Sequence, residues 1–368
     1  MNPTKELHRL GQRLWLDNLT RDLLVSGTLQ HYISDFAITG LTSNPAIFDH
    51  AIRNTVLYDE AIRDGAARGQ SPESLFFALA LADVTAAADL FRPIHDATAG
   101  VDGWASFEVS PLLADDTAAT VRQAVQLHAR VGRPNLFIKI PGTRAGVVAI
   151  EEAIFAGVPV NVTLLFSREQ YLAAADAYLR GVERRIAAGL DPRVSSVASL
   201  FVSRWDVAIR DTVPQALRNR LGIAVAQRAY KAYRELLASA RWEKLSSAGA
   251  RPQRLLWAST GTKDPTSSDT LYVEALAAPD TINTIPDKTL LAYADHGRLR
   301  GGLRADGGDS ESTLAEFARS GVNEASLAEQ LLREGTQTFD KSWNDLKECI
   351  AFKARLLGKE ATAQTSRP

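Results

Sequence analysis

Short runs rich in apolar and β-branched residues alternate with longer segments of helical periodicity along most of this chain. Such alternation predicts β/α units arranged around a parallel sheet. The eight predicted strands are Leu14–Leu19, Ala37–Leu41, Ala105–Val109, Leu136–Ile140, Val160–Leu164, Val197–Val202, Leu255–Ala258 and Thr281–Ile285. The predicted helices between them include Ser71–Ala88, Thr117–Arg130, Ser167–Ala188, Ile223–Ala240 and Thr270–Leu276. Eight units in succession favour an α/β protein of the closed (β/α)8 TIM barrel class.

An open, doubly wound sheet would produce the same alternation of strands and helices. That alternative loses its main support because no G-x-G-x-x-G motif follows the first predicted strand. The segment Gly261-Thr262-Lys263 is also too short to be a Walker phosphate loop. We therefore prefer the barrel.

The chain is longer than a barrel requires. A barrel needs about 250 residues, so roughly 100 of the 368 residues should form insertions or terminal additions. Asp49–Gln70 is one candidate, and Gly297–Gly321 is a second that we expect to be a long loop with little core of its own. A final helix at about Gln337–Leu357 should pack across the barrel. Residues 1–357 are thus predicted to be a single barrel domain with additional helices and loop insertions, and 358–368 a disordered tail.

Charge and hydropathy bear on the class of partner. With 42 Lys and Arg against 43 Asp and Glu, the net charge of −1 indicates no nucleic acid partner and no anionic membrane surface. We see no signal peptide and no apolar run near the roughly 18 residues of a membrane span. The histidines lack metal-binding spacing, and the one cysteine, Cys349, cannot form an intramolecular disulfide. We expect a cytoplasmic protein without a metal site.

The predicted strand Leu136–Ile140 contains a lysine, Lys139, among apolar residues. Burying an ammonium group is costly unless a partner compensates, and loss of its proton leaves an amine that can attack a carbonyl. Two interpretations stay open at this point. Lys139 either points into the barrel as a reactive amine, or points outward from a half-exposed strand and extends its head into water.

Other strands also carry polar side chains at or near their carboxyl ends, where the active site of such a barrel lies. They are Asp17, Asn44, Glu108, Asn161, Thr163, Ser199, Arg204, Ser259 and Lys263. Each has a structural alternative: Asp, Asn and Glu can cap helices, Thr is common in strands, Ser packs or forms turns, and Arg forms surface ion pairs. Together with Lys139 they give seven successive strands a polar residue near one end, which favours a shared site. Asn161 and Thr163 lie on one face of their strand because they are two residues apart.

Three ordered motifs then point to a known family. They are Gly40-Leu41-Thr42-Ser43-Asn44-Pro45, Lys139-Ile140-Pro141-Gly142-Thr143-Arg144-Ala145-Gly146 and Asn161-Val162-Thr163-Leu164-Leu165-Phe166-Ser167. From Leu14 to about Leu357 the chain resembles a transaldolase. The resemblance implies a barrel of the class I aldolase kind, a Schiff-base lysine at Lys139, and no metal or organic cofactor. It also implies that the substrates are sugar phosphates.

The implied reaction belongs to the non-oxidative pentose phosphate pathway. It moves a dihydroxyacetone unit from sedoheptulose 7-phosphate to glyceraldehyde 3-phosphate, giving erythrose 4-phosphate and fructose 6-phosphate. The resemblance assigns Asp17 as the base for the C4 hydroxyl and Glu108 as a second acid/base that works through a water held near Thr163. It assigns Asn44 and Asn161 to the hydroxyl groups of the retained three-carbon unit.

The resemblance places Ser199 and Arg204 in a phosphate site, where a guanidinium suits a phosphate dianion. Many transaldolases carry an arginine soon after a serine at the end of the seventh strand, whereas this chain has Ser259 followed by Lys263. Lys263 is offset from the usual position. We expect these two residues to complete the phosphate site, and the offset leaves that expectation open.

Two rival functions and one assembly question also stay open. A fructose 6-phosphate aldolase of the same superfamily would release dihydroxyacetone; such chains are much shorter and their first acid/base position differs, so the length of this chain and Glu108 favour the transferase. A barrel that only binds sugar phosphates would be expected to lack one of Asp17, Glu108 and Lys139, and all three are present. The sequence does not distinguish a homodimer from a monomer, because helices on a barrel exterior can pair or remain solvated.

Overall fold

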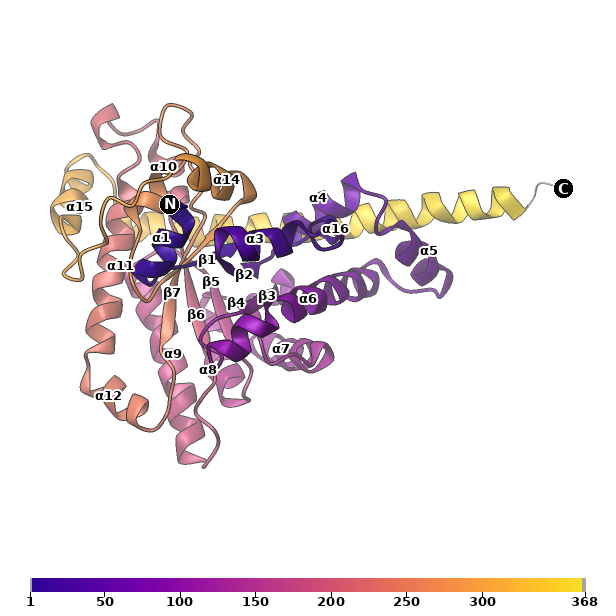
Figure 1. Cartoon of the computed structure of the whole chain (residues 1–368), viewed down its shortest axis with the longest axis horizontal. Helices are drawn as coiled ribbons and strands as arrows, with labels where there is room; N and C mark the ends of the chain where they lie inside the picture. Colours follow the sequence, from indigo (N-terminus) through magenta and orange to yellow (C-terminus); the bar gives the residue numbers. More distant parts are fainter. Residues whose placement is uncertain (1, 366–368) are drawn as a thin grey trace.

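The computed structural model describes residues 2–365, and its centre is a closed barrel of eight parallel strands (Figure 1). Neighbours in sequence are neighbours in the barrel, and β1 pairs with β8 to close it. The strands are β1 (Arg13–Leu16), β2 (Ile38–Thr42), β3 (Trp104–Glu108), β4 (Leu136–Pro141), β5 (Val160–Leu165), β6 (Ser196–Phe201), β7 (Gln253–Ala258) and β8 (Ile282–Ile285). The predicted (β/α)8 barrel is confirmed, and each observed strand overlaps a predicted one.

Helices surround the barrel, and several begin at the cap residues that the sequence offers. The side chains of Ser71, Asp116, Thr143 and Ser167 each accept a hydrogen bond from a backbone N–H in the first turn of the helix that follows. The helices are α1 (Pro3–Leu10), α2 (Arg21–Val25), α3 (Thr28–Phe36), α4 (Pro45–Asn54), α5 (Asp59–Ala67), α6 (Pro72–Ala97), α7 (Thr117–Val131), α8 (Arg144–Phe155), α9 (Arg168–Ala187), α10 (Ser203–Ile209), α11 (Leu221–Leu237), α12 (Ala240–Ser247), α13 (Leu271–Ala275), α14 (Asp287–His296), α15 (Ser310–Arg319) and α16 (Glu324–Thr365), with 3-10 turns η1 (Pro111–Leu113) and η2 (Gln215–Leu217).

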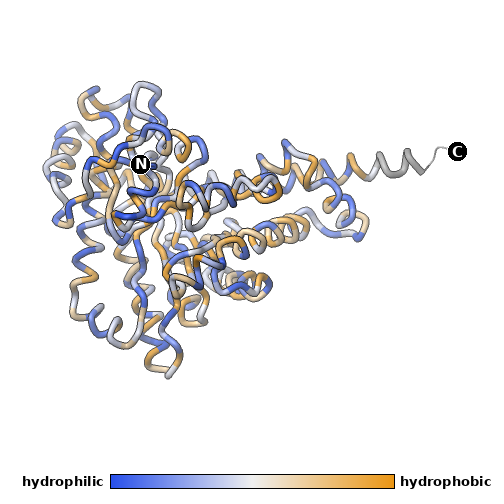
Figure 2. Tube along the Cα trace, in the orientation of Figure 1, coloured by the Kyte–Doolittle hydropathy of each residue, from blue (hydrophilic) through white to orange (hydrophobic). Residues whose placement is uncertain are grey.

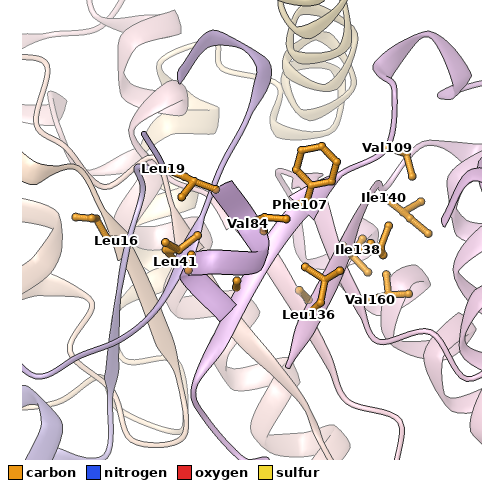
Figure 3. Close-up of a cluster of buried hydrophobic side chains, with 14 of the residues drawn as sticks. Leu16, Leu19, Leu41, Val84, Phe107, Val109, Leu136, Ile138, Ile140 and Val160 are labelled. Carbon is orange, nitrogen blue, oxygen red and sulfur yellow. The ribbon is translucent and has the colours of Figure 1, made fainter. Parts of the chain in front are cut away.

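Alternate residues of each strand face opposite sides of the barrel wall. On β4, Leu136, Ile138 and Ile140 belong to the apolar cluster between the barrel and its helices (Figure 3). Phe137 belongs instead to a second apolar cluster with Trp15 and Trp104. Because side chains alternate along a strand, this register places the next residue of the Phe137 face, Lys139, inside the barrel.

Aromatic rings and an ion pair fill the amino-terminal end of the barrel interior. The rings of Trp104 and Phe137 stack with their centroids 4.1 Å apart. The indole Nε1 of Trp15 donates to Asp102 Oδ1 at 3.2 Å, and the other carboxylate oxygen of Asp102 lies 3.1 Å from Arg13 Nε. This packed floor leaves the carboxyl-terminal half of the interior for polar side chains, as expected for a barrel of this class.

The segment Gly297–Gly321 differs from the loop that we predicted. It contains helix α15, whose Leu314 and Phe317 are buried and pack in the second apolar cluster. These two residues, spaced three apart, present one apolar face, and α15 contacts α11. The prediction of a loop without its own core was wrong because the glycine and arginine content of 297–308 obscured this short amphipathic helix.

The last helix is much longer than predicted. Helix α16 starts at Glu324 rather than near Gln337 and continues to Thr365, so the first part of the predicted disordered tail is helical. The remainder of that tail, 366–368, lies outside the described residues. As expected, α16 crosses the barrel: it contacts β5, η1 and α10 at one part of its length and α4, α5 and α6 further along (Figure 1).

Helix α6 is apolar along most of its length and lies beside α16 (Figure 2). By length and composition it is the one described helix that could cross a membrane, a feature that the sequence analysis did not identify. Most of its apolar stretch is nevertheless buried inside the protein, where it packs on β3 and α16. Its hydrophobicity therefore fits a core helix of a soluble protein.

Trp343 anchors α16 to α6. Its ring is 1% exposed and lies with its centroid 5.0 Å from that of Phe76 and 5.6 Å from that of Phe77. We expect Trp343→Ala to lower the free energy of unfolding by about 3–5 kcal/mol, because it removes buried area and leaves a cavity. Chemical denaturation measures this change. Phe352→Ala, on the same helix but 60% exposed, should change stability by less than about 0.5 kcal/mol; equal losses would contradict the anchoring role.

Candidate active site

Lys139 lies inside the barrel with its amine held by two acceptors. Its Nζ donates to the Ser43 carbonyl oxygen at 2.9 Å and to Glu108 Oε2 at 3.1 Å, and the residue is 5% exposed. The pairing of Glu108 with Lys139 across β3 and β4 places the two side chains side by side. The alternative in which Lys139 points outward into water is therefore wrong.

Two carboxyl groups interact with this amine. Burial raises the pKa of Glu108, although the charge and hydrogen bond of Lys139 oppose the shift. Burial also raises the pKa of the half-buried Asp17, again against the charge of Lys139 and a 3.0 Å hydrogen bond from Thr42 Oγ1. Both groups thus retain a proton to higher pH than an ordinary carboxyl, which suits groups that exchange protons with a ligand.

A cavity of about 140 Å³ opens beside Lys139. Eight of the ten predicted site residues line it: Asp17, Asn44, Lys139, Thr163, Ser199, Arg204, Ser259 and Lys263. Two do not. Glu108 contacts the lining through Lys139, and Asn161 lies fully buried beneath it, with its Nδ2 donating to Ser106 Oγ at 3.0 Å and its Oδ1 accepting from Ser199 Oγ at 2.7 Å.

Asn44 has both roles that the sequence left open, as a helix cap and as a residue of the site. It is the N-cap of α4, where its Oδ1 accepts a hydrogen bond from the backbone N–H of Ile47 at 3.2 Å. The same side chain lines the cavity. Since the cap uses only the amide oxygen, the Nδ2 group of Asn44 can donate to a ligand.

The backbone is irregular where β5 approaches the cavity. The pairing of β5 with β6 shifts register between Val162 and Leu165, and Leu164 has a positive φ of 58°. Residues other than glycine adopt this conformation at a cost, and it recurs at functional sites. Next to it, the fully buried Thr163 Oγ1 has no hydrogen-bond partner among the described residues. A buried hydroxyl that faces a cavity is available to a bound group.

The far side of the cavity is positively charged. Arg204 and Lys263 both line it, and neither forms an ion pair or hydrogen bond within the described part of the chain. Burial lowers the pKa of Arg204, whose guanidinium lies over the ring of Phe201. Ser259, with a positive φ of 56°, brings its hydroxyl within 2.9 Å of Ser203 Oγ. Two cations without a carboxylate in hydrogen-bond contact, beside the Ser259 hydroxyl, form a site suited to an anion such as phosphate.

Several lining residues were missed in the sequence analysis. Thr42 and Thr284, whose hydroxyls are 2.7 Å apart, line the cavity and hold Asp17 through Thr42. Phe201 and Phe339 supply its apolar wall. The alternation along β6 places Phe201 on the face of Ser199, so a register argument could have found it. Phe339 belongs to α16, which we expected to pack across the barrel, but no sequence signal places this residue beside the amine.

No group of three or more His, Cys, Asp and Glu side chains that could hold a metal ion occurs among residues 2–365. The groups at or next to the cavity are one buried amine, the carboxyl groups of Asp17 and Glu108, and an anion site. These groups can form an imine with a carbonyl compound, move protons and hold a phosphate.

Comparison with known proteins gives consistent matches. Residues 14–350 match the family described as Transaldolase/Fructose-6-phosphate aldolase. The chain is 45% identical over 371 residues to Transaldolase 1 of Streptomyces avermitilis, with 98% of each chain covered. It is 44% identical over 357 residues to a transaldolase of a Parafrankia species, covering 95% of this chain and 97% of the relative. Transaldolase 2 of a Nostoc species is 38% identical over 376 residues, covering 97% and 99%.

From the raised pKa of Asp17 we predict how the free energy of unfolding depends on pH. A carboxyl whose pKa is raised on folding contributes stability that is present below its unfolded pKa and is lost as pH rises through its folded pKa. We therefore expect Asp17→Asn to become more stable relative to the wild type as pH rises from about 4 to about 8. Urea denaturation at a series of pH values measures the difference.

Asp264 is the control with the opposite sign. Hydrogen bonds from Asn219 and Thr266 lower its pKa, so its contribution is present above the unfolded pKa and lost as pH falls. Asp264→Asn should therefore become less stable relative to the wild type as pH rises toward about 4 and should show no further change above that pH. The same pH trend in both variants would contradict the assigned shift of Asp17.

Proposed function

The chain belongs to the transaldolase/fructose-6-phosphate aldolase family, and we propose that its barrel carries out the transaldolase reaction. It is then a transferase that moves a dihydroxyacetone unit from sedoheptulose 7-phosphate to glyceraldehyde 3-phosphate, through a Schiff base on Lys139. The observation that carries this proposal is the buried Lys139 amine between Glu108 and the cavity, inside a closed barrel. Its substrates are sugar phosphates.

The first half of the reaction forms the imine. The unprotonated amine of Lys139 adds to the C2 carbonyl of the ketose phosphate, and the C2 oxygen takes a proton to become a hydroxyl. Loss of this hydroxyl as water requires an acid, and we assign that role to Glu108, whose raised pKa keeps a proton available. Thr163 faces the cavity with an unpartnered hydroxyl that can hold the water through which Glu108 acts.

The second half breaks and remakes a carbon–carbon bond. Asp17 takes the proton of the C4 hydroxyl, the C3–C4 bond breaks, and the bonding electrons move toward the iminium nitrogen. The aldehyde product leaves while a three-carbon enamine stays on Lys139. When an acceptor aldehyde binds, the enamine C3 attacks its carbonyl carbon, and Asp17 returns the proton to the new C4 oxygen.

Polar groups around the amine hold the three-carbon unit. Asn44 lines the cavity with a free amide NH₂, which suits a sugar hydroxyl. Asn161 was also assigned to substrate hydroxyls. Because Ser106 and Ser199 hold its amide beneath the lining, we propose that it acts through the second hydrogen of its Nδ2 and through the position of Ser199.

The anion end of the cavity receives the substrate phosphate. Arg204 supplies a guanidinium without a competing carboxylate in hydrogen-bond contact, and Lys263 supplies a second charge from the exposed rim. Ser259 lines the same cavity and offers its hydroxyl to the phosphate, whereas the Ser199 hydroxyl can donate to phosphate only by giving up its hydrogen bond to Asn161 Oδ1. Lys263 thus takes the place of the arginine that many transaldolases carry.

The rival function within the family is an aldolase that releases dihydroxyacetone. The relatives described above are named transaldolases, and the chain matches them over nearly its whole length. The decisive experiment follows fructose 6-phosphate with and without erythrose 4-phosphate as acceptor. A transaldolase consumes the ketose fast only with the acceptor, whereas equal rates would identify the aldolase. The cytoplasmic location is a prediction that cell fractionation would test. Whether the protein is a homodimer or a monomer would be tested by measuring its size in solution.

Lys139 should carry the covalent intermediate. Borohydride reduction in the presence of fructose 6-phosphate should attach a three-carbon or six-carbon adduct, and peptide mapping should place it on Lys139. Lys139→Ala should lose both the adduct and transfer activity, because no other amine is positioned in the cavity by a carboxylate. Lys244→Ala, which removes an exposed lysine, is the control and should keep both. Transfer activity retained in Lys139→Ala would refute the mechanism.

Lys263 should act on binding of phosphorylated substrates. We expect Lys263→Ala to raise KM for fructose 6-phosphate about tenfold or more, since it removes a charged hydrogen bond to phosphate. Trapping of unphosphorylated dihydroxyacetone by borohydride should be unchanged. Lys263→Arg should restore most of the affinity. A normal KM in Lys263→Ala would exclude this residue from the phosphate site.

A further inference from the structure

We propose that Phe339 determines whether the three-carbon unit is transferred to an aldehyde or released to water. Phe339 is a residue of α16, far in sequence from the strands that carry the proposed chemistry. In this role its ring is a specificity-determining group that keeps water away from the imine on Lys139. The inference rests on the proposed function and deepens it.

Phe339 contributes an aromatic ring to the cavity wall close to the Lys139 amine. Its ring centroid lies 5.9 Å from Lys139 Nζ, and the residue is 8% exposed. It lines the cavity and packs in the second apolar cluster together with Leu164, Phe166 and Phe201. Apart from Phe201 and Pro286, the larger side chains of the lining are polar or charged, so this ring supplies much of the apolar surface beside the amine.

A glycine one helical turn earlier sets how close the ring comes. Gly335 and Phe339 are four residues apart and therefore lie on one face of α16. A Cβ on Gly335 would lie 3.0 Å from Leu164 Cδ2 and 3.7 Å from Arg204 Nη1. Leu164 is buried, so a Cβ at this distance requires the Leu164 side chain or α16 to shift by a few tenths of an ångström. Any larger residue at 335 should lift this part of α16 and its phenylalanine away from Lys139.

The rest of α16 is fixed on both sides of this contact. Ala328 and Leu331 are buried in the second apolar cluster, and Trp343 packs on Phe76 and Phe77 of α6. Further along, Lys353 Nζ donates to Asp59 Oδ1 and to the Thr55 carbonyl oxygen, each at 2.6 Å. The helix is therefore a rigid support for the ring, and the position of Phe339 does not depend on a mobile loop.

The intermediate has two fates, and water decides between them. In transfer, C3 of the enamine forms a bond to the acceptor carbonyl carbon. In release, C3 takes a proton instead, a water molecule adds to C2 of the resulting iminium ion, and the C2–N bond breaks. That second path yields free dihydroxyacetone and the Lys139 amine, and it consumes one water. An apolar ring next to the amine disfavours water at C2, whereas Asp17, Arg204 and Lys263 line the same cavity and can bind the polar acceptor.

The simpler interpretation is that Phe339 only fills space in the core. A packing role would lower stability, and it would reduce transfer and release together. A water-excluding role changes the ratio of release to transfer. That ratio separates the two interpretations even where a substitution also slows the enzyme.

The experiment measures both products of fructose 6-phosphate for Phe339→Ala and Phe339→Leu. Transfer is followed as sedoheptulose 7-phosphate formed with erythrose 4-phosphate, and release as free dihydroxyacetone without the acceptor. We expect Phe339→Ala to raise the release-to-transfer ratio about tenfold or more, and Phe339→Leu to raise it less, because leucine keeps most of the apolar cover. Borohydride should still trap the adduct on Lys139 in both variants.

Two further variants keep the test interpretable. Gly335→Ala leaves residue 339 a phenylalanine but should displace its ring from Lys139. It should therefore shift the release-to-transfer ratio in the same direction as Phe339→Ala. Phe352→Ala lies on the same helix with its side chain 60% exposed, and it should leave the ratio unchanged. If Phe339→Ala does not fold, Phe339→Leu and Gly335→Ala still decide the question.

The outcomes for the inference and for the proposed function are distinct. A wild type that transfers normally, with a ratio that stays within about twofold in Phe339→Leu and Gly335→Ala, overturns the inference alone. A wild type that shows no transfer overturns the proposed function. A ratio that rises in both variants, with the adduct still trapped, supports the inference.

Discussion

The contact between the Lys139 amine and the Glu108 carboxylate, buried inside a closed barrel, is the constraint on which the rest of the site depends. Removing an ammonium and a carboxylate from water is unfavourable, and the barrel compensates only in part with one further acceptor, the Ser43 carbonyl. The pair is therefore poorly explained as a stabilising feature. It is well explained as a reactive one, because burial raises the pKa of Glu108 and so keeps a proton donor beside the amine.

The barrel interior is divided along its axis to support this pair. Trp15, Trp104 and Phe137 fill the amino-terminal end and supply packing. The next inward positions on the same strands carry Ser106 and Lys139, so each wall changes from apolar to polar within one alternation. Two of the non-glycine residues with positive φ, Leu164 and Ser259, lie at the polar end. Stability and chemistry thus come from different layers of the same strands, as the barrel class allows.

The carboxyl-terminal helix joins two parts of the molecule that are otherwise separate. Its first half packs on the barrel mouth through Gly335 and Phe339, and its second half packs on α4, α5 and α6 through Trp343 and Lys353. The helices inserted between β2 and β3 therefore do more than lengthen the chain. They pack against α16, the helix that covers the site, and this contact explains what the additional residues of this barrel do in the structure.

The sequence by itself determined the order and type of the elements and the lysine-centred motif. The short apolar run Leu136–Ile140 and the helical periodicity of Ser71–Ala88 and Thr117–Arg130 are local signals, and the structure confirms the strand and the helices that they predicted. The inward position of Lys139 was one of two alternatives, and only the closed barrel selected it. Tertiary packing likewise placed Asn161 beneath the cavity lining and stabilised the helix within 297–321.

Only the tertiary structure brought Phe339 to Lys139, gave Gly335 its neighbour Leu164, and left Arg204 and Lys263 beside one cavity without ionic partners. These contacts join residues far apart in the chain. Periodicity reports which face of an element is apolar but not which element that face meets, since the distance between two helices or strands is fixed by the packing of all the others.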